Sequence, residues 1–256
     1  MEQETLDIIY QDKHIIAVNK PSGLLVHKSP IDKHETRYAM RILRDQIGQW
    51  VYPVHRLDKP TSGLLLFALS SDIAKVIGEQ FTQNLVKKTY IAVVRGHTPL
   101  GGIIRHPIKE TAMFKHQKKQ MEQKAPQDAL TLYKRLATTE CAYSIDRYPT
   151  TRYSLIAAYP RTGRTHQIRK HLKHISHPII GDAKHGKGNL NRVFTERHDS
   201  HRLLLAAISL KLIHPVTNTP LNLYAPLQSD FIATLSALGW DEAHLPASQY
   251  RNKSTR

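Results

Sequence analysis

The chain has 256 residues and a hydrophobic fraction of 40%, enough to form the core of one large domain or two small ones. No segment approaches the roughly 18 consecutive apolar residues of a membrane span, and the single cysteine, Cys141, excludes an internal disulfide and a cysteine-rich metal site. The 37 Lys and Arg residues exceed the 21 Asp and Glu residues and give a net charge of +16, which favours a polyanionic partner, most often nucleic acid.

The first part of the chain alternates short apolar runs with turn-forming residues. Strands are predicted over residues 8–10 and 14–18, and a tight loop over Lys20–Gly23. Further predictions are a helix over residues 37–47 that ends at Gly48, a buried strand over 64–69, a helix from Ser71 to about residue 85, and a strand over 89–94.

The second part begins with a polar, Lys-rich stretch at residues 105–125. We interpret it as an exposed excursion, which either touches RNA phosphates or is an ordinary solvated loop. Strands are predicted over residues 130–136, 153–159 and 203–213, helices over 165–174 and 230–238, and a disordered basic tail over 247–256. Strands outnumber helices and do not alternate strictly with them, which favours an α+β domain over a doubly wound sheet.

The segment His55–Gly63 places one carboxylate, Asp58, between basic residues at the start of a buried strand. Asp58 is therefore a candidate covalent nucleophile. One route is magnesium-dependent phosphoryl transfer with Asp182 as a metal ligand, although such sites need several carboxylates. The other is attack by the ionised carboxylate on an electrophilic carbon of a bound nucleotide. That route needs no metal, but it needs a nearby cation such as Arg169.

The segment Arg161–Arg169 is a second candidate site. Its glycine, Gly163, permits a sharp turn before a helix, whose free N–H groups favour anions. The side chains of Arg164, His166, Gln167 and Arg169 are donors suited to a phosphate or a base edge. The alternative is a basic helix on the surface.

Histidines and one tyrosine complete the candidates. His171, His174 and His177 are three residues apart, but no Cys or acidic residue accompanies them at ligand spacing, so no metal site is expected. Tyr90 lies in a predicted strand, where it could stack on an extruded base, relay a proton, or serve only in packing.

Five segments together resemble the RluA family of pseudouridine synthases over nearly the whole chain. They are Asn19–Leu24, His55–Gly63, Lys88–Gly96, Gly163–Arg169 and His177–Asp182. Two further strings, Arg147–Tyr153 and Gly181–Gly186, resemble the branch that modifies uridine 65 of tRNA. His185 departs from the family, because many members have tyrosine at that position.

The resemblance implies one catalytic domain over residues 1–246, with a mixed, mainly antiparallel sheet and a central cleft. It implies that Asp58 attacks the target nucleotide, that Tyr90 stacks on the uracil and serves proton transfer, and that Arg169 pairs with Asp58. Arg56 would fill the gap left by the flipped uridine. Whether Asp58 attacks C1′ of the ribose or C6 of the base stays open.

RNA or substrate contacts are expected from eight residues: Lys20, His55, Arg56, Thr61, Arg164, His166, Gln167 and Lys184. Many relatives carry an N-terminal S4 RNA-binding domain. This chain begins directly with the catalytic domain, so we expect its own basic surface to supply the RNA affinity. We expect a cytoplasmic monomer that needs no cofactor, no membrane and no protein partner, and that acts on tRNA. A silent RNA-binding module is a further alternative.

Overall fold

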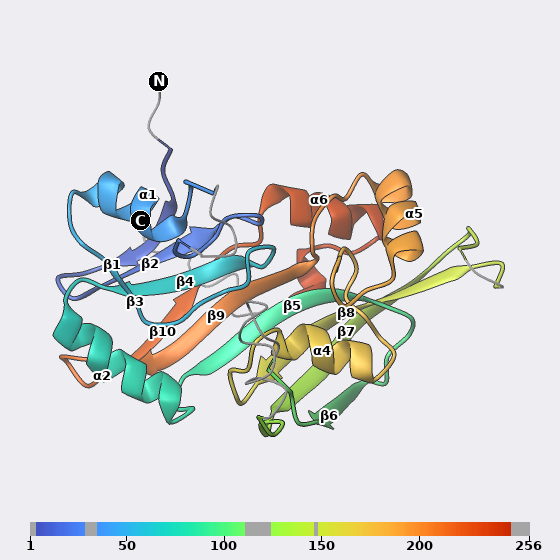
Figure 1. The fold of residues 1–256 in the computed structure, drawn as a ribbon. Coiled ribbons are helices and arrows are strands. Elements are labelled where there is room, and N and C mark those ends of the chain that lie inside the picture. The colour runs from blue at the N-terminus through green and yellow to red at the C-terminus, as the bar shows by residue number, and fades with distance from the viewer. Residues whose placement is uncertain (1–3, 29–34, 111–123, 146–147, 247–256) are drawn as a thin grey trace.

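A computed structural model describes residues 4–28, 35–110, 124–145 and 148–246. Ten strands form one sheet in the order β1-β2-β4-β9-β5-β8-β7-β6, with β10 paired to β9 and β3 paired to β4 (Figure 1). The strands are β1 (Asp7–Gln11), β2 (Ile15–Lys20), β3 (Tyr52–Pro53), β4 (Ser62–Ala68), β5 (Lys87–Arg95), β6 (Gly101–Arg105), β7 (Leu130–Cys141), β8 (Thr151–Pro160), β9 (Leu205–Ile213) and β10 (Pro220–Tyr224).

The helices are α1 (Ala39–Ile47), α2 (Ser71–Thr82), α4 (Gln167–His174), α5 (Gly188–His198) and α6 (Ser229–Ala237), with a short 3-10 turn, η2 (Glu242–His244). None of the helices in the described ranges is long and apolar enough to cross a membrane. The predicted tail, 247–256, and most of the Lys-rich stretch, 111–123, lie outside the described residues.

Continuous apolar runs form the central strands because both faces of the sheet are covered. In the first half, Ile16 and Val18 of β2 pack toward α1, whereas Ile15 and Ala17 pack toward α2. Successive side chains of a strand point to opposite faces, so one strand serves two clusters. This explains why β2 and β4 are buried at every position.

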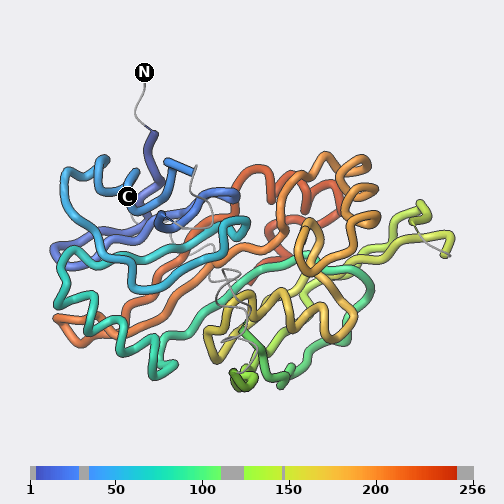
Figure 2. Tube along the Cα trace, viewed as in Figure 1, coloured from blue at the N-terminus to red at the C-terminus, as the bar shows by residue number. Residues whose placement is uncertain are grey.

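The second half repeats the arrangement with other helices. Ala92 and Val94 of β5 pack with α4, whereas Ile91 and Val93 pack with α5 and α6. Figure 1 shows α4 lying across β7 and β8, and α5 and α6 gathered at the upper right. The chain trace passes from the blue N-terminal strands to the green and yellow strands, and it returns between them as the orange β9 (Figure 2).

The two halves meet where β4 pairs with β9, the one parallel pairing among the described strands. The contact is short, with Ser62 opposite Ala206 and Gly63 opposite Ala207. Gly63 has a φ of +105°, and a Cβ there would lie 2.0 Å from the carbonyl oxygen of Ala207. Only glycine fits this approach, which fixes where the segment before β4 enters the sheet.

The predicted α+β class, the mixed and mainly antiparallel sheet, and most of the elements are confirmed. Gly48 ends α1 in the left-handed conformation, as predicted. The cap of α2 is Ser70 rather than Ser71, since the Ser70 hydroxyl accepts from the Ile73 amide at 3.3 Å. The strands β3, β6 and β10 and the helix α5 were not predicted. Arg105 ends β6, so the predicted Lys-rich loop was placed too early.

Candidate active site

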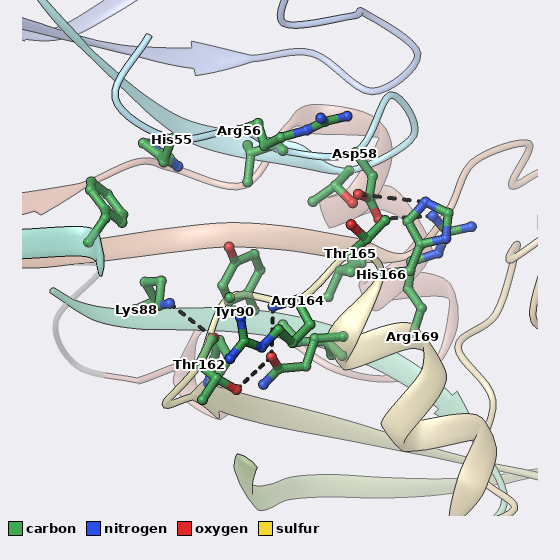
Figure 3. Close-up of a pocket in the computed structure, with 18 of the residues that line it drawn as sticks. His55, Arg56, Asp58, Lys88, Tyr90, Thr162, Arg164, Thr165, His166 and Arg169 are labelled. Carbon is green, nitrogen blue, oxygen red and sulfur yellow. Dashed lines mark hydrogen bonds and ion pairs between the residues drawn. The ribbon is translucent and has the colours of Figure 1, made fainter. Parts of the chain in front are cut away.

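A cavity of about 470 Å³ opens where the two halves of the sheet meet. Its lining contains residues 54–58 from the segment between β3 and β4, and Pro160 with residues 162–169 from the end of β8 into α4. Lys88 and Tyr90 of β5, Leu205 of β9, and residues in and just after α2 also line it. Both segments singled out in the sequence therefore face one cleft (Figure 3).

Asp58 lies in the turn that leads into β4, and 23% of its side chain is exposed. The Thr61 amide donates to the Asp58 carbonyl oxygen at 2.9 Å and closes this turn. Arg169 Nη1 donates to Asp58 Oδ2, also at 2.9 Å, across 111 residues of sequence. A charge-assisted hydrogen bond of this length is roughly twice as strong as one between neutral groups. The predicted Asp58–Arg169 contact is present.

Arg169 is itself held by Asp182, which is fully buried. Nε and Nη2 of Arg169 donate to the two carboxylate oxygens of Asp182, each at 2.8 Å. Burial opposes ionisation of Asp182, yet Arg169 and the backbone N–H of His185 hold its pKa below the ordinary value. Asp182 therefore binds Arg169, whereas the phosphotransferase alternative required it as a magnesium ligand.

Tyr90 projects from β5 into the cleft, with its ring packed between the two halves of the core (Figure 3). Burial, reinforced by the negative charge of Asp58, raises the pKa of the Tyr90 phenol far above its ordinary value. The hydroxyl thus stays protonated near neutral pH. A protonated phenol in this position can present its ring face to a base and donate a hydrogen bond.

Lys20 does not lie where an RNA phosphate could reach it. Its side chain is fully buried, and its Nζ donates to the carbonyl oxygens of Pro21 at 2.8 Å, Leu24 at 2.7 Å and Lys59 at 3.2 Å. Burial lowers the pKa of Lys20 to about 7. The contact with Lys59, the residue after Asp58, shows that Lys20 supports the Asp58 turn from beneath.

His55, Thr61 and Gln167 also make internal contacts. His55 Nε2 accepts from the Leu66 amide at 3.0 Å while its ring stacks on Phe81, and burial lowers its pKa to about 3. Thr61 is buried beside Asp58. The buried Gln167 amide group joins four partners, which are Thr162 Oγ1, the Arg164 amide, the Leu130 carbonyl and Thr131 Oγ1.

Arg56, Arg164 and Lys184 are the predicted contact residues that reach solvent. The Arg56 side chain is exposed at the rim of the cleft and points away from Tyr90 (Figure 3). Arg164 lines the cleft and donates through Nε to the Asp128 carbonyl oxygen at 3.1 Å. Lys184 is exposed outside the lining of the cleft, beside the Asp182 turn.

His166 lies closer to Asp58 than the sequence indicated. The helix begins at Gln167 rather than Thr165, and His166 is its N-cap in the left-handed conformation, with a φ of 56°. This backbone turn directs the imidazole at Asp58, with Nε2 3.8 Å from Oδ1. On its other side, Nδ1 lies 2.9 Å from Nε2 of His185.

The more distal histidines have structural roles. His171 is buried and contacts Thr131 Oγ1 and the His106 carbonyl oxygen, each at 2.9 Å, and His174 stacks on His106. His177 Nδ1 contacts the Arg95 carbonyl oxygen at 2.8 Å. Within the described ranges no group of three or more His, Cys, Asp or Glu side chains could hold a metal ion.

Sequence reasoning missed three neighbours of the site: Lys88, Asp182 as the partner of Arg169, and His185. Lys88 lines the cleft, donates to the Thr162 carbonyl oxygen at 3.1 Å, and has its pKa lowered by burial. The one available signal for Asp182 was a lone carboxylate that follows Ile179, Ile180 and a glycine.

The family model described as RNA pseudouridylate synthase matches residues 14–174, more than half of the chain. The chain belongs to the RNA pseudouridylate synthase family. The predicted family is thus confirmed. Its members are isomerases that form pseudouridine, so this chain is an isomerase of that kind. Nucleotide isomerisation is therefore favoured over phosphoryl transfer.

Similarity to named relatives extends over nearly the whole chain. The chain is 49% identical over 235 residues to the tRNA pseudouridine synthase C of Yersinia pestis, and the match covers 92% of this chain and 91% of the relative. It is 46% identical over 237 residues to the protein of that name in Vibrio parahaemolyticus, covering 93% and 96%.

Solved structures of RNA pseudouridylate synthase domains have a similar fold. The human RNA pseudouridylate synthase domain containing 4 has a TM-score of 0.68 at 26% identity and covers 91% of this chain and 93% of its own. The human domain containing 1 has the same TM-score at 25% identity and covers 91% and 89%. The similarity spans both halves of the sheet and hence the cleft between them.

Proposed function

We propose that this pseudouridine synthase modifies tRNA and that uridine 65 is its target. The relatives named tRNA pseudouridine synthase C, 46% to 49% identical over more than nine-tenths of the chain, support tRNA as the substrate. The net charge of +16 suits a polyanion of this kind. The strings Arg147–Tyr153 and Gly181–Gly186 support the position, although Arg147 lies outside the described residues.

Asp58 is the proposed nucleophile. One carboxylate oxygen attacks the target nucleotide, either at C1′ with departure of the uracil or at C6 of the base. The N1–C1′ bond breaks, the uracil turns, and a C5–C1′ bond forms. The bond to Asp58 breaks, which restores the free carboxylate, while the C5 proton passes to a base and N1 gains a proton. The product is an isomer of the substrate, so no oxidant, reductant or second substrate enters. Arg169 holds Oδ2 at 2.9 Å and leaves Oδ1 for the reaction.

Tyr90 is proposed to stack on the uracil and to exchange the proton at C5. Its ring lies on the floor of the cleft, and its hydroxyl projects into the space that the base would occupy. A stacked aromatic ring contributes about 1–3 kcal/mol per base. That contribution holds the uracil in place during the step in which it is detached from the ribose.

The size of the cleft supports base flipping. A volume of about 470 Å³ is typical of a small-molecule site and takes one nucleotide, not a helical stem. The target must therefore leave its stack, at a cost of a few kcal/mol. Exposed Arg56 at the rim is proposed to fill the vacated space, while Arg164, His166 and Lys184 contact the RNA backbone or the target nucleotide.

The other expected contact residues receive a different role. Four of them are directed into the protein. Polar atoms of Lys20, His55 and Gln167 form internal hydrogen bonds, and Thr61 is buried. We propose that they shape the two segments that carry Asp58 and Arg169. Their substitution would then weaken catalysis through geometry and stability rather than through RNA affinity.

The observation that carries the proposal is the hydrogen bond between Arg169 and Asp58 at the floor of the cleft. The test is incubation of the purified protein with unmodified tRNA transcript, followed by carbodiimide treatment and primer extension, with and without EDTA. We expect pseudouridine at position 65 under both conditions, and none in a transcript with cytidine there. Modification at another position would overturn the proposed target, and loss of activity in EDTA would overturn the metal-free route.

A further inference from the structure

One imidazole connects Asp58 to a histidine outside the cleft lining. Nε2 of His166 lies 3.8 Å from Asp58 Oδ1, and Nδ1 of the same ring lies 2.9 Å from Nε2 of His185. The two imidazole planes meet edge to face at 76°. His166 is therefore in contact on both sides, with a carboxylate on one and an imidazole on the other.

The negative charge of Asp58 decides which ring nitrogen of His166 carries the hydrogen. A neutral imidazole carries one N–H, so either His166 Nδ1 or His185 Nε2 donates in the bond between the rings. If His166 donated, its Nε2 lone pair would face a carboxylate oxygen, and two acceptors would repel each other. If His185 donates, His166 carries its hydrogen on Nε2 and directs it at Asp58. Both arrangements keep the bond between the rings, and the contact with Asp58 favours the second.

His185 is placed by the residue that also holds Arg169. Its backbone N–H donates to Asp182 Oδ1 at 2.9 Å. The carbonyl oxygen of Asp182 accepts from Gly186 N at 2.9 Å and from Asn191 Nδ2 at 3.1 Å, which closes a tight turn. Asp182 thus orders both groups that face Asp58, Arg169 directly and His166 by way of His185.

Charged groups on each element packed against His166 affect its pKa. Burial lowers its pKa, Asp58 before β4 opposes this, and positive charges on α4 and in the Asp182 turn reinforce it. These positive charges belong to Arg169, Lys170 and Lys184. Burial likewise lowers the pKa of His185 to about 4, against the charge of Asp182. Both imidazoles are therefore neutral near pH 7.

We propose that His185 is a positioning residue for the reaction, which holds His166 as the neutral Nε2–H form directed at Asp58. The inference rests on the proposed role of Asp58. While His185 donates to Nδ1, a second proton cannot add to His166 without breaking that bond. Without His185, His166 takes up a proton more readily and forms an ion pair with Asp58. The carboxylate oxygen left free by Arg169 is then no longer available to attack.

The first experiment needs no RNA. The protein is labelled with ¹⁵N-histidine, ring nitrogens are correlated with ring protons by NMR at pH 7, and the His166 signals are assigned by their loss in His166→Gln. We expect His166 with its hydrogen on Nε2. A hydrogen on Nδ1 in the wild-type protein would overturn the inference, whether or not any variant folds.

The second experiment uses His185→Leu, which removes the donor, and His185→Gln, which keeps an N–H at a similar distance. In His185→Leu we expect the His166 titration and the acid limb of the kcat profile to move to higher pH together. At pH 6 kcat should fall at least about fivefold with KM nearly unchanged, while His185→Gln stays within about twofold. The matched control is His201→Leu, at an exposed site.

Two results contradict the inference. One is a His166 titration that is unchanged in His185→Leu. The other is a loss of activity equal in His185→Leu and His185→Gln at all pH values, which would indicate packing alone. The NMR measurements do not depend on turnover, so they remain decisive even if Asp58 proves not to be the nucleophile or tRNA not to be the substrate.

Discussion

Arg169 joins Asp58 to Asp182 through three hydrogen bonds of 2.8–2.9 Å. Asp58 enters from the turn before β4, Arg169 from α4, and Asp182 from the turn after Ile180, so three separate segments meet at one guanidinium. Its planar geometry serves both carboxylates at once, with a forked pair from Nε and Nη2 to Asp182 and a donor on Nη1 for Asp58. The orientation of Asp58 thus depends on the burial of Asp182.

The first prediction concerns Arg169→Lys. Lysine keeps the charge, but one ammonium cannot reproduce the fork to Asp182 and also reach Asp58. We expect kcat to fall by about a hundredfold through misplacement of Asp58, and the free energy of unfolding to fall by roughly 1–3 kcal/mol, because buried Asp182 loses part of its pairing. Single-turnover rates and urea denaturation measure these effects.

Arg192→Lys is the matched control, because Arg192 pairs with Glu196 on the surface and is 74% exposed. Its cost should be within about 0.5 kcal/mol, and its kcat should be unchanged. Equal losses in the two variants would contradict a special role for the Arg169 fork.

A second prediction concerns Arg56→Ala. The Arg56 side chain is exposed, and a substitution at such a position changes stability by about 0.5 kcal/mol at most. If Arg56 stabilises the flipped state, its loss should lower kcat/KM on tRNA by at least about tenfold, a fraction of the cost of unstacking a base. Thermal unfolding and initial rates on tRNA test both parts. A large drop in Tm, or full activity, would count against the assigned role.

The third prediction is a pH dependence of stability. The pKa of His55 is about 3 in the folded protein because of burial and the nearby charge of Lys88, against about 6.5 in an unfolded chain. Below pH 6.5 the unfolded state therefore binds more protons, so stability is complete above pH 6.5 and is lost progressively as the pH falls toward 3. The slope from one such group is at most about 1.4 kcal/mol per pH unit.

His55→Gln removes the titrating group and retains an acceptor for the Leu66 amide. We expect the curve of unfolding free energy against pH to be flatter than the wild-type curve between pH 3 and 6.5. His201→Gln, at an exposed position, should leave that curve unchanged. Parallel curves for wild type and His55→Gln would show that His55 titrates normally in the folded protein.

Much of the fold could be predicted because apolar runs and turn residues are local signals. The buried strand predicted at residues 64–69 is β4, whose side chains are covered on both faces. The strand β6 was missed because Gly101 and Gly102 weaken the local signal and Ile103 is exposed. That strand forms through its pairing with β7, and no pattern within residues 101–105 shows this partner.

One contact of the site could be predicted from the sequence, and the others could not. Asp58 and Arg169 were paired from the resemblance, and the structure places them 2.9 Å apart. Lys20 was expected to contact RNA, yet three carbonyl oxygens surround its amine in the interior. Lysine is rarely buried, so the sequence alone did not indicate this. The hydrogen bonds between Arg169 and Asp182 join a helix to the turn after an apolar segment. Only the tertiary fold brings these two together, so no local pattern could predict the contact.

The central claim, that Asp58 performs the isomerisation, is tested most directly with Asp58→Asn on tRNA tritiated at C5 of uracil, which loses tritium when the C5–C1′ bond forms. The matched control is Asp7→Asn, at an exposed carboxylate of β1. We predict a fall in tritium release of at least about ten-thousandfold in Asp58→Asn, with tRNA affinity within about twofold of wild type. Release at the wild-type rate from Asp58→Asn would contradict the account.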